Sequence, residues 1–152
     1  ATDVDEDSWR LIMGVNLDGM FWITQAAIPH LKKSAGNIVN VASNAGFMGQ
    51  AYTVPYCAAK GAVINMTRAL AMEYIKSDIR VNAIAPGGMK TAMTENWSVP
   101  DDIDFELMQT YTGYRGMAEP ESAANAICWM ASEEASRCTG SILSVDGGLT
   151  AA

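Results

Sequence analysis

Three side chains that could move a proton lie close together in this sequence. Ser43 ends an apolar run, and after a glycine-containing loop Tyr56 and Lys60 stand four residues apart, near the start of a helix predicted to open at Pro55. Positions i and i+4 share one face of a helix, so the phenol and the ammonium should be neighbours. This spacing predicts proton transfer to or from an alcohol or a carbonyl group.

Each of these groups would have a separate part in that chemistry. A phenol is a weak base at neutral pH, but an adjacent cation such as Lys60 favours its ionised form. Tyr56 would then take a proton from an alcohol or give one to a carbonyl, while Ser43 holds the same oxygen. Asn16, by holding a water near Lys60, would complete a relay to solvent. A cofactor must carry the hydride, because no side chain can.

Purely structural interpretations of these residues remain open. A Tyr-x-x-x-Lys pair is a weak motif that also arises by chance on an exposed helix face. Ser43 fits a polar strand end, and Asn16 fits a core amide that finds its own hydrogen-bond partners. The combination of all four residues with a Pro-Gly pair at the end of the next strand favours a catalytic site over these structural interpretations.

Alternating helices and short apolar runs should position these residues. Strands are predicted at 38–42, 79–85 and 141–145, and the main helices at 5–33 and 55–77, with a further helix beginning at Pro120. Short connections between strand, helix and strand predict right-handed βαβ units. The fold class is therefore α/β, with three parallel strands whose carboxyl ends form the ligand-binding edge.

The least regular stretch is 92–117, which mixes aromatic and methionine side chains with an acidic run. A segment this long inside a compact domain is typical of a lid or a substrate-binding segment. The alternative is a pair of short helices that cover the core.

Composition narrows the class of protein. The chain has 152 residues, which suits one domain spanning 1–152, and its net charge of −7 argues against nucleic acid and anionic membranes as partners. No apolar run reaches the roughly 20 residues of a membrane span, and the acidic N-terminus does not resemble a signal peptide. The three cysteines lack metal-site spacing, so we expect reduced thiols, no metal and a cytoplasmic location.

The motifs together resemble those of the short-chain dehydrogenase/reductase family in its single-domain form. The resemblance covers essentially the whole chain. It is carried by Val15-Asn16-Leu17-Asp18-Gly19, Asn40-Val41-Ala42-Ser43, the Tyr56 to Lys60 motif, the segment 79–91 and Val145-Asp146-Gly147-Gly148.

This resemblance implies a Rossmann-like doubly wound parallel sheet and an NAD- or NADP-dependent enzyme that interconverts a secondary alcohol and a ketone. It implies a catalytic tetrad of Asn16, Ser43, Tyr56 and Lys60. Cofactor contacts would come from Tyr56, Lys60, Pro86, Gly87, Met89 and Thr91, and substrate contacts from Ser43, Ala45, Tyr56, Gly88, Met93 and Trp97. The family also implies a homodimer or homotetramer formed through the helices 5–33 and 55–77.

The sequence departs from the family pattern at its start. It lacks the first strand with its glycine-rich pyrophosphate turn, the residue that chooses NAD or NADP, and the Asn-Asn-Ala-Gly motif. We therefore expect the C-terminal three-fifths of such an enzyme, weak or inactive alone, with an open edge on its first strand. A non-catalytic dimerisation or assembly module is the alternative, and an unrelated α/β fold is a third.

Overall fold

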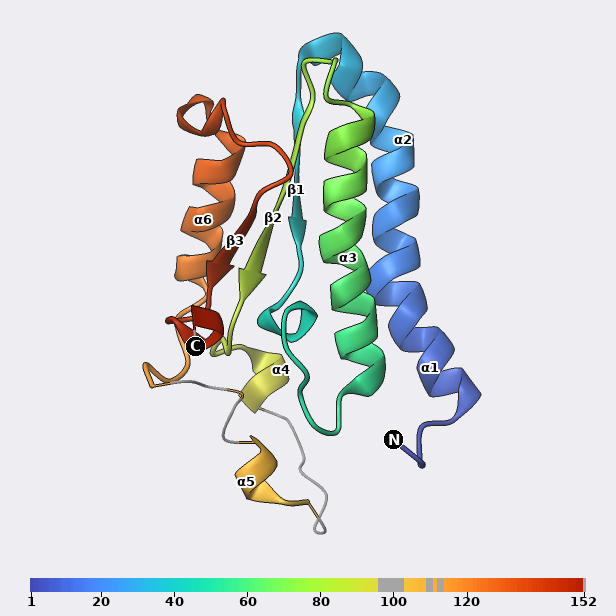
Figure 1. Ribbon diagram of the computed structural model, residues 1–152, viewed down its shortest axis with the longest axis vertical. Coiled ribbons are helices and arrows are strands. Elements are labelled where there is room, and N and C mark those ends of the chain that lie inside the picture. Colours follow the sequence, from blue (N-terminus) through green and yellow to red (C-terminus); the bar gives the residue numbers. More distant parts are fainter. Residues whose placement is uncertain (96–102, 109–110, 112–113, 152) are drawn as a thin grey trace.

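The computed structural model describes residues 1–95, 103–108, 111 and 114–151. Within them lies a parallel sheet of strands β1 (Asn37–Val41), β2 (Arg80–Pro86) and β3 (Ile142–Val145), which are neighbours in that order. Each predicted strand is confirmed to within one residue at either end. The helices α2 (Gly19–Ser34) and α3 (Val54–Glu73) lie on one side of the sheet and α6 (Glu121–Ala131) on the other (Figure 1). The predicted α/β class is therefore confirmed.

The strands all run toward one end of the molecule, where the candidate residues gather. In Figure 1 the three arrows point the same way, and the loop after β1, the first turns of α3 and the helix α4 (Ala92–Glu95) meet there. The site is thus placed at the carboxyl ends of the strands, as is usual for open parallel sheets.

The first predicted helix is continuous but not uniform. It comprises α1 (Glu6–Met13), a π-helical turn at Gly14–Asp18 and then α2. Asp5 caps its start by accepting a hydrogen bond from the Ser8 amide at 2.6 Å. A π-helical turn inside an α-helix is rare and often marks a functional position, and this one contains Asn16.

The predicted apolar stripe of this helix is only partly buried. No residue of α1 is buried, Ile23 is 74% exposed, and only Thr24 and Ile28 of α2 are buried. The reason is that β1 is the edge of the described sheet, so nothing in the described chain covers that side of the helix. Joined through the π turn, Glu6–Ser34 has 29 residues and a window of mean hydropathy 1.3. By length and composition alone it could cross a membrane, and core helices of soluble proteins and signal sequences meet the same two criteria.

Strand β2 forms the centre of the core. Val81, Ala83 and Ile84 are completely buried between the neighbouring strands and the helices. Asn82 is buried with them, and it donates to the Cys138 carbonyl at 2.7 Å and accepts from the Ser141 amide at 3.0 Å. Its carboxamide thereby ties β2 to the turn that enters β3.

Strand β1 was predicted to be buried on both faces, and this is wrong in part. Asn40 is buried but Val41 is 42% exposed. The Ala42 amide pairs with the Ile84 carbonyl of β2 at 2.9 Å, so the main-chain groups of Val41 face the opposite, open side. The predicted open edge is therefore present in the described sheet.

The end of α6 is held by side chains from the strands. Arg80 donates to the carbonyls of Met130 at 2.9 Å and Ser132 at 3.1 Å, and Asn37 donates to that of Ala131 at 2.9 Å. The last carbonyls of a helix have no partner within the helix, and a cation there also complements the helix dipole. Arg80 thus acts as the C-terminal cap of α6.

Segment 92–117 contains two short helices, α4 and α5 (Phe105–Met108). The Asp104 amide donates to the Tyr52 hydroxyl at 2.9 Å, and the Tyr111 hydroxyl donates to the Ala51 carbonyl. Its described parts are therefore tied to the loop that follows Ser43. Neither the lid role nor the alternative, a helix pair that covers the core, is tested by these contacts, and both stay predictions.

Candidate functional site

Ser43 sits where β1 gives way to a short 3-10 turn, Asn44–Gly46. Its extended backbone, with φ of −170° and ψ of 158°, lets the hydroxyl cap that turn by accepting from the Ala45 amide at 3.2 Å. The same hydroxyl donates to the Asn44 side-chain oxygen at 3.1 Å. Ser43 is only 7% exposed, so its orientation is set by these two neighbours.

Asn44 is a site neighbour that the sequence prediction missed. It is 3% exposed, and its side-chain oxygen accepts a second hydrogen bond from Gln50 at 3.3 Å. Its amino group is buried without a hydrogen-bond partner in the described part of the chain. The signal was present in the sequence, because Asn44 directly follows a serine at a strand end.

Gly46 allows this turn to touch helix α3. A Cβ at Gly46 would lie 2.6 Å from the Ile64 Cδ1 and 2.7 Å from the Lys60 carbonyl oxygen. Such contacts are too close for any side chain, so the absence of one lets the two backbones approach. This packing holds Ser43 near the helix that carries Tyr56 and Lys60.

Tyr56 and Lys60 occupy the first two turns of α3, with Pro55 in the first turn, where a proline fits a helix well. The Lys60 Nζ lies 5.5 Å from the centroid of the Tyr56 ring and donates to the Val41 carbonyl at 3.0 Å. The residue is 8% exposed, and burial lowers the pKa of its ammonium. The structure therefore places the phenol and the ammonium side by side, close to the strand end that carries Ser43.

Asn16 approaches the site from the other helix. Its amino group donates to the Ile12 carbonyl at 3.0 Å within the π-helical region. Asn16 and Lys60 both line a cavity of about 540 Å³ that runs along the open edge of β1 past Val39. A water relay between them has room in this cavity, and it remains a prediction.

The residues implied to bind the cofactor lie at the end of β2 and in the segment after it. Pro86, Gly87 and Met89 are half-buried at the carboxyl end of that strand, as is the implied substrate residue Gly88. Gly87 packs against Asp146, since a Cβ there would lie 2.9 Å from the Asp146 Cα. The lack of a side chain at Gly87 thus lets the end of β2 approach Asp146 at the end of β3.

The other implied binding residues differ in how far the structure describes them. The Thr91 amide donates to the Thr94 hydroxyl at 2.9 Å, close to the start of α4. Ala45 is buried in the turn after Ser43. Met93 lies in α4, but its side chain is outside the described part, and Trp97 lies wholly outside the described residues.

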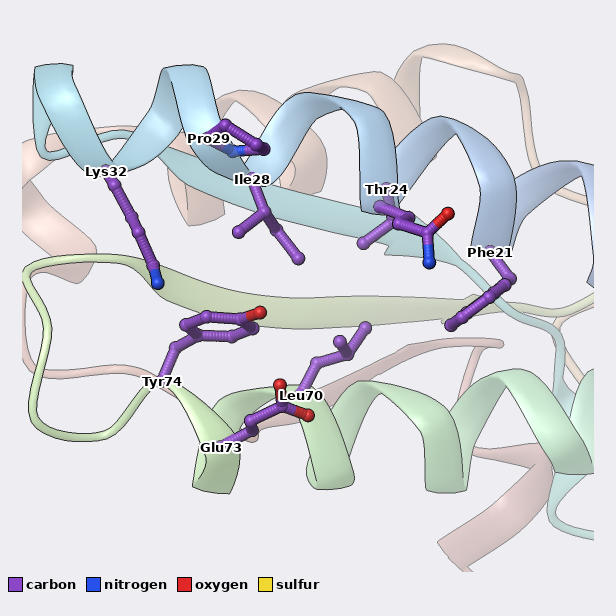
Figure 2. Close-up of a pocket in the computed structure, with 9 residues that line it drawn as sticks. Phe21, Thr24, Ile28, Pro29, Lys32, Leu70, Glu73 and Tyr74 are labelled. Carbon is purple, nitrogen blue, oxygen red and sulfur yellow. The ribbon is translucent and has the colours of Figure 1, made fainter.

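A second cavity, of about 410 Å³, lies between α2 and α3. Figure 2 shows Lys32 of α2 reaching over the Tyr74 ring, with Ile28 and Leu70 between the helices. The Lys32 Nζ is 4.9 Å from that ring's centroid. Because a helix rises 1.5 Å per residue, Leu70 lies about 20 Å along α3 from Tyr56. This cavity therefore belongs to the far end of the helix pair and not to the candidate site.

In chemical terms, the arrangement joins a hydroxyl, a phenol and a buried ammonium at one edge of a parallel sheet. These groups suit proton exchange with an oxygen atom of a small molecule. Among the described residues no group of three or more His, Cys, Asp or Glu side chains could hold a metal ion.

Comparisons with known proteins relate the whole chain to one family. The model of a family described as "Enoyl-(Acyl carrier protein) reductase" matches residues 1–150. The meso-2,3-butanediol dehydrogenase of Serratia marcescens is 42% identical over 145 residues, which are 95% of this chain and 57% of that protein. The 3-oxoacyl-[acyl-carrier-protein] reductase of Thermotoga maritima is 40% identical over 146 residues, which are 95% of this chain and 58% of that protein.

Solved structures agree with the sequence relatives. A 4-hydroxyisoleucine dehydrogenase complexed with NADH and succinate is 29% identical with a TM-score of 0.84, over 99% of this chain and 62% of that one. A chain from Burkholderia xenovorans, described as a short-chain dehydrogenase/reductase, is 31% identical with a TM-score of 0.86. The match covers 99% of this chain and 58% of that one. The chain thus spans about three-fifths of the length of the relatives it matches.

Proposed function

We propose, because the chain belongs to the short-chain dehydrogenase/reductase family, that it carries the proton-transfer part of an NAD- or NADP-dependent enzyme. The reaction would interconvert a secondary alcohol and a ketone. The single observation that supports this most is the position of Lys60, whose buried ammonium lies against the Tyr56 ring and is fixed to the strand that ends at Ser43.

In this proposal Tyr56 exchanges the proton with the substrate oxygen. The ammonium of Lys60 favours the phenolate when Tyr56 acts as a base. Ser43 holds the same oxygen by a hydrogen bond, and Asn16 passes the proton toward solvent through water in the cavity that it shares with Lys60. When bound, the nicotinamide would accept or supply the hydride.

The residues present suit the nicotinamide end of such a cofactor. An ammonium has three N–H donors, and within the described residues Lys60 gives one of them, to Val41. Two donors thus remain for hydroxyl groups such as those of a ribose. The implied contacts at Pro86, Gly87, Met89 and Thr91 lie at the same edge of the sheet. The glycine-rich pyrophosphate turn is not part of this sequence.

Activity is best tested in two forms of the protein. One is the chain itself, which we expect to be weak or inactive. The other is a fusion in which the N-terminal part of the Serratia marcescens relative precedes residue 1. Both would be assayed with a panel of secondary alcohols and ketones and with both dinucleotides. Clear turnover by the 152-residue chain alone would contradict the expectation that it needs the preceding part.

The role of Tyr56 is tested within the fusion. Tyr56→Phe should lower kcat by about 100-fold or more, because it removes the acid–base group and leaves the ring. Tyr114→Phe is the matched control, since that side chain is fully exposed. Equal rates for Tyr56→Phe and the parent fusion would refute the catalytic assignment.

We also propose that the helices 5–33 and 55–77 mediate a homodimer or homotetramer. Large apolar side chains are exposed along them, namely Leu11, Val15, Trp22, Ile23 and Met72. Exposed apolar patches of this kind mark interaction surfaces. The same exposure favours the second candidate function, an assembly module without chemistry. Sedimentation measures whether the chain forms a dimer or a tetramer. Calorimetry separates the oxidoreductase from the assembly module, because a pure assembly module gives no heat with either dinucleotide.

A further inference from the structure

We infer that Asn44 is a positioning residue that sets the direction of the Ser43 hydroxyl. This inference rests on the proposed function of Ser43. A serine hydroxyl has one proton to donate, and Ser43 donates it to the Asn44 side-chain oxygen at 3.1 Å. In this arrangement the proton is committed to Asn44, so it is not available to a substrate oxygen.

The Asn44 carboxamide is satisfied on one side only. Its oxygen accepts from both Ser43 and Gln50, whereas its amino group is buried and has no partner among the described residues. Buried donors without a partner are rare in proteins, because burial removes their water. Asn82 of β2 is the contrasting case, since both ends of its carboxamide are hydrogen-bonded. Asn82 therefore has a structural role, whereas the Asn44 amino group has no hydrogen-bond partner among the described residues.

A half-turn of the Asn44 carboxamide exchanges its oxygen and its amino group. The amino group then donates to the Ser43 oxygen, and a matching half-turn presents the Gln50 side-chain oxygen to the same amino group. Ser43 still accepts from Ala45, but its proton is now free to hold a substrate oxygen. The Asn44 carboxamide therefore has two hydrogen-bonding arrangements, and one of them turns Ser43 into the donor that the proposed reaction needs.

The resting arrangement can be tested in the chain without any turnover. Nuclear magnetic resonance measures how fast the Ser43 hydroxyl proton exchanges with water. Asn44→Leu should speed that exchange by about tenfold, because the acceptor is lost. Asn44→Asp should keep it slow, because a carboxylate still accepts, and the exposed Asn125→Asp is the matched control for charge. Asn44→Ala replaces Asn44→Leu if the larger side chain prevents folding. Unchanged exchange in the folded Leu or Ala variant would overturn the inference.

The second arrangement is tested by the pH dependence of ketone reduction, in whichever of the chain and the fusion turns over. In Asn44→Asp the introduced carboxyl can donate when protonated and only accept when ionised. The ratio of its kcat to that of the parent should therefore rise about tenfold from pH 8 to pH 5, with KM for the dinucleotide unchanged.

A purely structural role for Asn44 would give a ratio that does not change with pH, and this result would overturn the inference. Asn125→Asp should show such a constant ratio. Absence of turnover in both parent forms would instead refute the proposed function, and the exchange measurement would still decide the direction of the Ser43 hydroxyl.

Discussion

The Lys60 ammonium donates to the main-chain carbonyl of Val41 at 3.0 Å, and this contact joins helix α3 to the open edge of β1. The carbonyl faces away from β2, because the next residue, Ala42, is the one that pairs with Ile84. Lys60 therefore uses an acceptor that a further strand would otherwise take. The same contact fixes the ammonium beside Tyr56. Its acceptor, Val41, comes two residues before Ser43 in the chain.

Removing the charge of Lys60 should change how stability depends on pH. Burial lowers the pKa of this ammonium below its ordinary value of about 10.5. Between the two values the unfolded chain binds more protons than the folded one, so the free energy of unfolding rises with pH. Lys60→Met should flatten that rise and increase the free energy of unfolding at neutral pH by about 1 kcal/mol. Urea midpoints at several pH values test this, with the exposed Lys76→Met as control. A lower midpoint for Lys60→Met at neutral pH would contradict the argument.

The turn after Ser43 should not tolerate a side chain at Gly46. Gly46→Ala would place a Cβ 2.7 Å from the Lys60 carbonyl oxygen, and a backbone atom cannot move aside cheaply. We expect a loss of about 1–3 kcal/mol in the free energy of unfolding, measured with urea. Gly49→Ala is the control, because nothing lies within 4 Å of its Cβ position and its φ is not left-handed. Equal midpoints for the two variants would show that the turn and α3 are not in tight contact.

Loss of the Arg80 side chain should destabilise the end of α6. Arg80→Met removes hydrogen bonds to the half-buried carbonyls of Met130 and Ser132 and leaves the end of α6 without its cation. The expected cost is about 2–3 kcal/mol in the free energy of unfolding. Arg80→Lys should restore part of it, because an ammonium cannot reach the carbonyls with two nitrogens. The exposed Arg68→Met controls for loss of charge, and an equally small effect at both positions would refute the capping role.

Acid should remove the contribution of Asp146 to stability. Burial acts to raise the pKa of this carboxyl, but hydrogen bonds from the Thr150 hydroxyl and the Thr150 and Gly148 amides outweigh it, and the pKa lies below the ordinary 3.8. The contribution is therefore complete above about pH 4 and is lost as pH falls through the lowered pKa. Because solvent screens this half-exposed carboxylate, Asp146→Asn should be less stable than the parent by only about 0.5 kcal/mol at neutral pH.

The acid dependence provides the internal check on Asp146. The difference in free energy of unfolding between Asp146→Asn and the parent should shrink below about pH 4. The exposed Asp78→Asn should have the same free energy of unfolding as the parent at every pH. Thermal unfolding from pH 7 down to pH 2 measures it. A difference that stays constant over this range would mean that the ionised carboxylate is not what stabilises the turn.

The main elements were predictable because their signals are local. Short β-branched runs ending in Ser43, Pro86 and Asp146 gave the strands, and the i, i+4 spacing placed Tyr56 beside Lys60. Burial was less predictable, because it depends on what covers an element. Ile23 has helical spacing, but the described sheet ends at β1 and leaves it exposed.

The helix geometry around Asn16 and the burial of Asn44 could not be predicted from the sequence. The π turn that holds Asn16 has the same residue pattern as an ordinary helix, so periodicity could not reveal it. The burial of Asn44 follows from the tight packing of Gly46 on α3, which is a tertiary contact. Both depend on how distant segments meet, and a single sequence does not state that directly.

The hydrogen bonds that Arg80, Asn37 and Asn82 make across the sheet also bear on how the molecule opens. They fasten both the end of α6 and the turn before β3 to the two preceding strands, so the two segments are held by the same part of the sheet. In native-state amide hydrogen exchange, α6 and β3 should therefore behave as one cooperative unit with a common opening free energy. Helix α1, which buries no residue, should exchange independently and much earlier.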